Sequence, residues 1–270
     1  MATTDAALRL LARAQSPEDV RAALTAASVE DPRVRAGLLE RYRHLGTNGP
    51  RLDPTTTVRS EILIALRDHL LAVDLPLLEK AATTNERGYS GEIAGPLRSA
   101  AIVAIASIDP ATAKVHAVRL LADTANTDPM SGEPALSAAR VLAAQGEALV
   151  LYLHAMGGGA TGEVLGECLR SLTELPTQLA LLLAEQLRET RDEAALLGLV
   201  DLVLGHPDPA VAAAFLPGWL AADASEDLYR YVAAAAVASR REDLRAIIVD
   251  LAKEEVRREH RTILEEALTL

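Results

Sequence analysis

The feature that most constrains this chain is a three-residue phrase, an aliphatic residue followed by Arg and Ser, that recurs along the sequence. Its full copies are Val58-Arg59-Ser60, Leu97-Arg98-Ser99 and Leu169-Arg170-Ser171, and a copy without the arginine is Leu136-Ser137. The serines stand at positions 60, 99, 137 and 171, so the steps between them are 39, 38 and 34 residues. A period in this range predicts an array of structural repeats that stack on one another.

A second phrase accompanies the first. Its copies are Ser90-Gly91-Glu92, Ser131-Gly132-Glu133 and Thr161-Gly162-Glu163, each just upstream of the last three copies of the first phrase. A hydroxyl residue followed by a carboxylate suits the first turn of a helix, where the hydroxyl can cap free amides and the carboxylate meets the positive end of the helix dipole. We therefore expect each copy to begin a helix.

Composition and turn signals predict an all-α fold. The hydrophobic residues, 50% of the chain, are mostly Ala and Leu, and aromatic residues are only 3%. Ala and Leu are strong helix formers. Asp-Pro pairs begin at residues 31, 53, 109, 128 and 208, and at least three of them have the pattern of a helix start. No segment shows convincing period-two alternation, so we expect no sheet.

These signals predict about eight antiparallel helix pairs in one domain over 1–270. The pairs are 5–13 with 17–27, 31–45 with 56–72, 75–84 with 91–107, 110–123 with 132–145, 147–156 with 160–173, 176–189 with 191–204, 208–221 with 225–238, and 240–252 with 256–269. The repeats are best marked over 31–175 and degenerate over 176–270. Pro217 falls inside a predicted helix and should kink or end it.

A two-helix unit of this length, with an aliphatic-Arg step in its second helix and Asp-Pro near a helix start, resembles the HEAT-repeat family. The resemblance covers most of the chain and implies a right-handed α-solenoid. It also implies that Arg59, Arg98 and Arg170 bond toward an Asp of a neighbouring turn and help to tie successive units together. Three-helix armadillo units are the nearest competitor, and the two-helix spacing disfavours them.

Charge and cysteine content narrow the function classes. The formal net charge is -11, with 38 acidic against 27 basic residues, and no dense basic run is present. This balance disfavours nucleic acid and favours a partner with basic patches. Cys168, the single cysteine, lies in an apolar helix face and is predicted to be buried and inert. No apolar run reaches the roughly 20 residues of a membrane span. We expect a cytoplasmic protein, and the excess of Arg over Lys together with the many Ala residues is typical of a GC-rich bacterial genome.

Candidate binding residues lie in the long stretches that join the first helix of a pair to the second: 46–55, 85–90, 124–131 and 157–161. Stacking of the pairs would place these stretches on one edge, and such loops often form a binding edge. The alternative is loop length without a role. The candidate partner-binding residues are Arg51, Asn85, Arg87, Tyr89, Asn126 and Asp128.

The sequence offers little for catalysis or metal binding. The six histidines are scattered, none has a His partner at one-turn spacing, and no Gly-x-Ser-x-Gly elbow is present. We therefore predict no cofactor and a non-enzymatic scaffold or adaptor that binds a protein on its concave face or loop edge. The alternatives are a regulatory subunit of an enzyme complex and a HEAT-like enzyme, either a DNA glycosylase or a bilin lyase. The glycosylase would need a basic, aromatic-bearing groove, and the bilin lyase offers no sharp motif.

Overall fold

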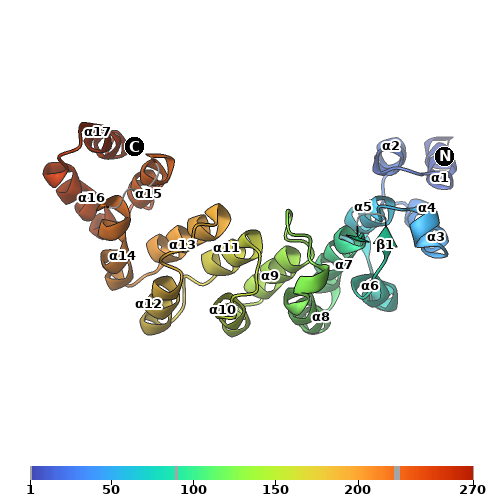
Figure 1. Cartoon of the computed structure of the whole chain (residues 1–270). Coiled ribbons are helices and arrows are strands. Elements are labelled where there is room, and N and C mark those ends of the chain that lie inside the picture. Colours follow the sequence, from blue (N-terminus) through green and yellow to red (C-terminus); the bar gives the residue numbers. More distant parts are fainter. Residues whose placement is uncertain (1, 89–90, 222–225, 270) are drawn as a thin grey trace. The chain divides into compact units, whose positions relative to one another are not determined.

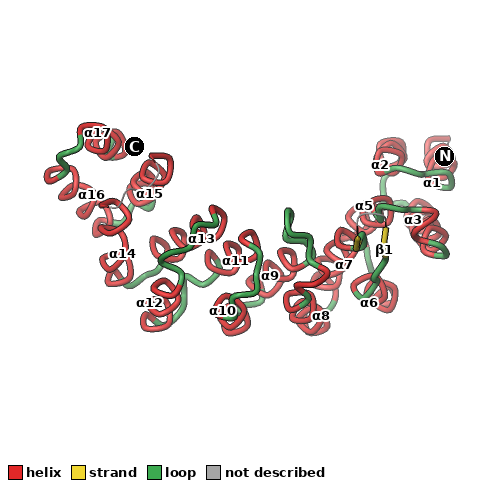
Figure 2. The backbone as a smooth tube through the Cα atoms, in the orientation of Figure 1, coloured by secondary structure: helices red, strands yellow, loops and turns green. Residues whose placement is uncertain are grey.

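The computed structural model describes residues 2–88, 91–221 and 226–269 and shows an all-helical protein (Figures 1 and 2). The described residues form 17 α-helices, three short 3-10 helices and two strands of two residues each. The contacts divide the chain into two compact units, Met1–Glu147 and Ala148–Leu270. We call them unit 1 and unit 2 and describe each by itself.

Unit 1 holds the first nine α-helices and both strands. Its α-helices are α1 (Ala2–Leu11), α2 (Pro17–Ala26), α3 (Pro32–Gly46), α4 (Gly49–Leu52), α5 (Thr57–Leu66), α6 (Leu75–Ala82), α7 (Gly95–Ile108), α8 (Pro110–Ala122) and α9 (Ala135–Ala144). The 3-10 helices are η1 (Arg67–His69), η2 (Ala72–Asp74) and η3 (Thr124–Asn126), and the strands are β1 (Arg87–Gly88) and β2 (Gly91–Glu92). Helices α2, α5, α7 and α9 contact one another in that order, and α1, α3, α6 and α8 each pack against the next long helix along the chain.

Unit 2 repeats this contact pattern with eight helices. They are α10 (Ala148–Met156), α11 (Gly162–Arg170), α12 (Thr177–Gln186), α13 (Glu193–Gly205), α14 (Pro209–Ala221), α15 (Glu226–Ala238), α16 (Glu242–Glu254) and α17 (Arg258–Ala267). Consecutive helices contact as the pairs α10–α11, α12–α13, α14–α15 and α16–α17. The second helices, α11, α13, α15 and α17, contact in order, and so do the first helices, α10, α12, α14 and α16.

Each of the sixteen predicted helices has a counterpart, but the predicted helix 91–107 begins only at Gly95, after β2, and the predicted helix 56–72 ends at Leu66, before η1. Further differences lie in the connections. The segment predicted as a loop over 46–55 contains α4, where Pro50 fits the first turn of a helix because it needs no amide partner there. The expectation of no sheet is wrong for the ladder that pairs Arg87 with Glu92 and Gly88 with Gly91. A ladder of two residues is too short to show alternation in the sequence. Pro217 does not end its helix, because α14 continues through it.

Three of the five Asp-Pro pairs start helices, as predicted. The Asp31 carboxylate accepts the Arg33 amide at the start of α3, and Asp109 caps α8 in the same way. Asp208 accepts the Ala210 amide at the start of α14. Such caps typically contribute about 1 kcal/mol each. Asp53 does not start a helix at the proline that follows it. Its carboxylate instead accepts the amides of Val58 and Arg59 in the first turn of α5 and the Nε of the buried Arg59 side chain.

Two helices of unit 2 meet at glycines. A Cβ atom added to Gly198 of α13 would lie 2.3 Å from the carbonyl oxygen of Gly166 in α11. A Cβ added to Gly166 would lie 2.4 Å from the carbonyl oxygen of Ala194. Neither distance is one that a real side chain adopts, so the absence of side-chain atoms is what lets these two backbones touch.

Cys168 is fully buried in α11, which confirms the prediction from its apolar helix face. Burial raises the pKa of its thiol to about 12, because the thiolate would lose its hydration. We expect labelling of the native protein by a thiol reagent to be at least about 100-fold slower than labelling in denaturant, since the thiolate is the reactive form. The slow rate should persist as pH rises toward 9. Equal rates in native buffer and denaturant would contradict the buried position.

None of the described helices has both the length and the apolar character needed to cross a membrane.

Candidate functional site

Arg59 of α5 is a buried charge at the start of its helix, with 3% of its side chain exposed. Its Nε donates to Asp53 Oδ2 at 3.0 Å, and its two terminal nitrogens donate to the Glu86 carboxylate oxygens at 2.8 and 2.7 Å. Asp53 belongs to the loop before α5, whereas Glu86 belongs to the loop between α6 and α7. Arg59 therefore joins its own helix to the next helix pair. Burial alone would lower the pKa of its guanidinium, but the hydrogen bonds that it donates to Glu86 and Asp53 raise this pKa overall.

Arg98 of α7 repeats this arrangement one pair later. It bonds to Glu92 Oε2 at 2.8 Å, six residues before it, just as Asp53 stands six residues before Arg59. Its other bonds go to the Asp123 carboxylate at 3.2 Å and the Asn126 carbonyl oxygen at 2.8 Å, both after α8. The two arginines thus make equivalent contacts in successive helix pairs. Arg59 bonds to the loop that precedes β1, and Arg98 bonds to residues at η3.

Arg170 of α11 departs from this pattern. Its side chain is 45% exposed, and its Nε lies 3.9 Å from Asp201 Oδ2 of α13. An exposed pair at this distance contributes little to stability. The residue at this position of the third copy of the phrase is therefore a surface residue and is not equivalent to Arg59 or Arg98.

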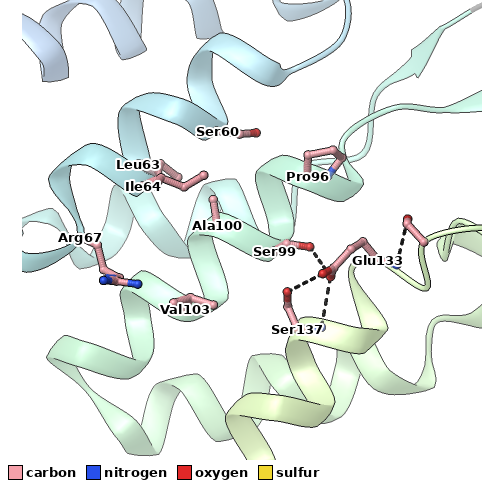
Figure 3. Close-up of a pocket in the computed structure, with 11 residues that line it drawn as sticks. Ser60, Leu63, Ile64, Arg67, Pro96, Ser99, Ala100, Val103, Glu133 and Ser137 are labelled. Carbon is pink, nitrogen blue, oxygen red and sulfur yellow. Dashed lines mark hydrogen bonds between the residues drawn. The ribbon is translucent and has the colours of Figure 1, made fainter. Parts of the chain in front are cut away.

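Three of the four serines of the recurring phrase, Ser60, Ser99 and Ser137, line a groove in unit 1, on the face of α5, α7 and α9 (Figure 3). We call it the serine groove, and its volume is about 500 Å³. Its polar lining is Ser60, Ser99, Ser131, Ser137 and Glu133, together with Arg67, the first residue of η1. Its apolar lining is Leu63, Ile64, Pro96, Ala100 and Val103. Helices α5, α7 and α9 therefore place the serines of three copies of the phrase along one surface.

Glu133 organises the α9 side of the serine groove. Its carboxylate accepts the Ser99 hydroxyl at 2.7 Å, the Ser137 hydroxyl at 2.9 Å and the Ser137 amide at 3.1 Å. The amide bond caps α9, and the Ser99 bond joins α9 to α7. The Ser131 hydroxyl, which the sequence predicted as the cap, accepts only the Glu133 amide at 3.4 Å. The cap of this helix is the carboxylate, because α9 begins at residue 135, beyond the reach of Ser131.

The middle of the serine groove is apolar and partly open to solvent. Ile64 is 58% exposed, Val103 is half-buried, and Leu63 and Ala100 form the buried floor. In Figure 3, Arg67 lies at the α5 end, while Glu133 lies at the other. Because the apolar strip lies between a cation and an anion, a ligand with opposite charges at its two ends would bind along it in one orientation only.

The predicted loop residues are not gathered into one site. Arg51 is exposed in α4 and lines a separate pocket, while Asn85 is exposed beside Glu86 in another. Arg87 is exposed in β1, and Tyr89 lies outside the described residues. The loop 157–161 belongs to unit 2, whereas the other three loops belong to unit 1.

Two predicted residues bond within their own loop. The Asn126 amide nitrogen donates to both carboxylate oxygens of Asp123, at 2.8 and 3.1 Å. The Asp128 carboxylate accepts the amides of Met130 and Ser131 at 2.8 Å each, and these bonds, that from Ser131 first, lower its pKa. Both side chains stabilise the turn before α9. Met130, next to them, is 86% exposed.

Within the described ranges, no group of three or more His, Cys, Asp or Glu side chains is placed to hold a metal ion. In comparisons with known proteins, no family model, no curated protein and no solved structure matches this chain.

Proposed function

We propose that this protein is a non-enzymatic binding module, a HEAT-like α-solenoid that holds a protein partner in the serine groove. The observation that carries the proposal is the groove itself, formed by equivalent positions of α5, α7 and α9. The ordered contacts of the helix pairs within each unit support the solenoid part of the proposal. A surface preformed by packed helices loses little entropy on binding.

The lining of the serine groove suggests an extended or helical polypeptide segment as its occupant. An apolar side chain of the partner would pack over Leu63, Ala100 and Val103, where the walls offer more carbon than polar atoms. A basic residue would follow near Glu133, which agrees with the expectation from the net charge of -11. An acidic residue would face Arg67. The sequence predicts binding on the concave face or on the loop edge. Because the serine groove is formed by helices, binding on a surface of the helices has more support than binding on the loop edge.

A peptide library displayed on phage tests this proposal with one pair of matched variants. Ile64→Asp puts a charge into the serine groove, and Val115→Asp puts one on α8, outside the groove. The native side chains are 58% and 53% exposed, so both substitutions should leave the fold intact. We expect selected peptides to combine an apolar with a basic residue, and Ile64→Asp to weaken their binding at least about tenfold.

Val115→Asp should bind the selected peptides as the wild type does, with affinities measured by calorimetry. Peptides that bind Ile64→Asp and the wild type equally well would contradict a role for the groove. If both variants lose binding while their circular dichroism is unchanged, the peptide interface is not confined to the serine groove.

A further inference from the structure

A second pocket of unit 1 is lined by positive charge in a protein whose net charge is -11. Its volume is about 610 Å³. The basic residues that line it are Arg13, Arg41, His44 and Arg51, and the others are Ala12, Gln15, Leu52 and Pro54. None of the described side chains that line it is acidic. We call it the arginine pocket.

The chain brings these residues together from two consecutive helix pairs. Arg13 lies in the loop between α1 and α2, Arg41 and His44 are one turn apart on α3, and Arg51 lies in α4. The positive charges that line one pocket repel one another in the absence of a counter-charge. A cleft lined by one sign of charge concentrates ions of the opposite sign.

Arg41 is the fixed member of the arginine pocket, since only 9% of it is exposed. Its guanidinium donates to the Ala14 carbonyl oxygen through Nε at 2.9 Å and through a second nitrogen, and to the Ala12 carbonyl oxygen at 3.3 Å. A guanidinium has five N–H donors, so two remain for a ligand. Burial lowers its pKa, and Asp53 and Asp19 oppose this effect.

Those two carboxylates are engaged elsewhere. Asp53 pairs with Arg59, and Asp19 accepts the amides of Gln15 and Ser16 at the start of α2. Arg13 and Arg51 are exposed, and within the described part of the chain neither side chain has a hydrogen bond or an ion pair. Two exposed guanidinium groups thus line the same pocket as the buried guanidinium of Arg41.

We propose that the arginine pocket binds the phosphate group of a small phosphate monoester. Two N–H groups of one arginine guanidinium can donate to two oxygens of the same phosphate. A phosphate monoester carries close to two negative charges at neutral pH. The volume exceeds that of a single phosphate ion and lies in the range of small-molecule sites, so the phosphate carries an organic group. This site shares no residue with the serine groove, and either proposal can fail without the other.

Titration followed by phosphorus NMR tests the proposal on the full chain, with inorganic phosphate and with a phosphoserine peptide. We expect saturable binding of inorganic phosphate at millimolar concentration or below, on the order of 4 kcal/mol. Arg13→Gln with Arg51→Gln should weaken it at least about tenfold. The matched control is Arg87→Gln with Arg119→Gln, which removes the same charge from two exposed residues of unit 1 and should bind phosphate as the wild type does.

The peptide distinguishes two sources of the same chemistry. Tighter binding of the phosphoserine peptide than of inorganic phosphate would assign the site to a phosphorylated side chain, and the reverse would assign it to a free small molecule. Three results would overturn the proposal: no saturable binding of either probe, equal weakening in both double variants, or binding of citrate as tight as that of phosphate.

Discussion

Replacing Arg59 with alanine should lower the free energy of unfolding of unit 1 by about 3–5 kcal/mol, the largest effect we expect from a single side chain. The substitution removes the guanidinium that pairs with the carboxylates of Asp53 and Glu86, whose side chains are 1% and 13% exposed, and leaves Asp53 only its bonds from two backbone amides. Two partly desolvated negative charges would then face each other across the space the guanidinium filled. Urea unfolding followed by circular dichroism measures the loss.

The matched control is Arg67→Ala. Arg67 also pairs with an acidic residue, Asp68 at 3.2 Å, but its side chain is 51% exposed. Removal of the Arg67 side chain should lower the free energy of unfolding by less than about 1 kcal/mol. Similar losses in the two variants would show that the buried position of Arg59 does not carry the stability that we assign to it. Adding Asp53→Asn and Glu86→Gln to Arg59→Ala should recover part of the loss, because it removes the unpaired charges.

Gly198→Ala is expected to lower the free energy of unfolding of unit 2 by at least about 2 kcal/mol. A Gly→Ala substitution inside a helix normally raises the free energy of unfolding, by up to about 1 kcal/mol. Here the new methyl group would overlap the backbone of Gly166, including its carbonyl oxygen at 2.3 Å, and backbone cannot rotate aside as a flexible side chain can. Helices α11 and α13 must separate to admit it.

Gly218→Ala is the control for this prediction within the same unit. Gly218 is exposed in α14, and a Cβ there would meet no described atom within 4 Å. It should therefore stabilise unit 2 slightly, by the ordinary helix preference. If Gly198→Ala also stabilises in urea unfolding, the contact between α11 and α13 is looser than the structure describes.

The helices could be predicted from the sequence because their signals are local. Asp31, Asp109 and Asp208 mark helix starts through bonds to amides two residues later, which any reader of the sequence can anticipate. The ladder between β1 and β2 could not be predicted, since two residues carry no periodicity. The single domain over 1–270 stays a prediction.

The candidate sites were harder to predict because they depend on residues that are distant in sequence. The phrase that contains Ser60 and Ser99 is evident in the sequence, but its arginine, Arg59 or Arg98, is the member that predicts a role. The arginine faces the interior, and the serine beside it faces the groove. Successive residues of a helix point about 100° apart, so one phrase can mark both a buried tie and a surface. The arginine pocket gave no sequence signal, because Arg13 and Arg51 are 38 residues apart.

The ties made by Arg59 and Arg98 change where this chain can be cut. Repeat proteins are often shortened between helix pairs, on the view that each pair is a separate module. Ending the chain after α6 would remove Glu86 and leave Arg59 with only Asp53 in a buried position. A shorter version that keeps its stability must therefore extend through the following loop, or carry an apolar residue in place of the last arginine and its acid.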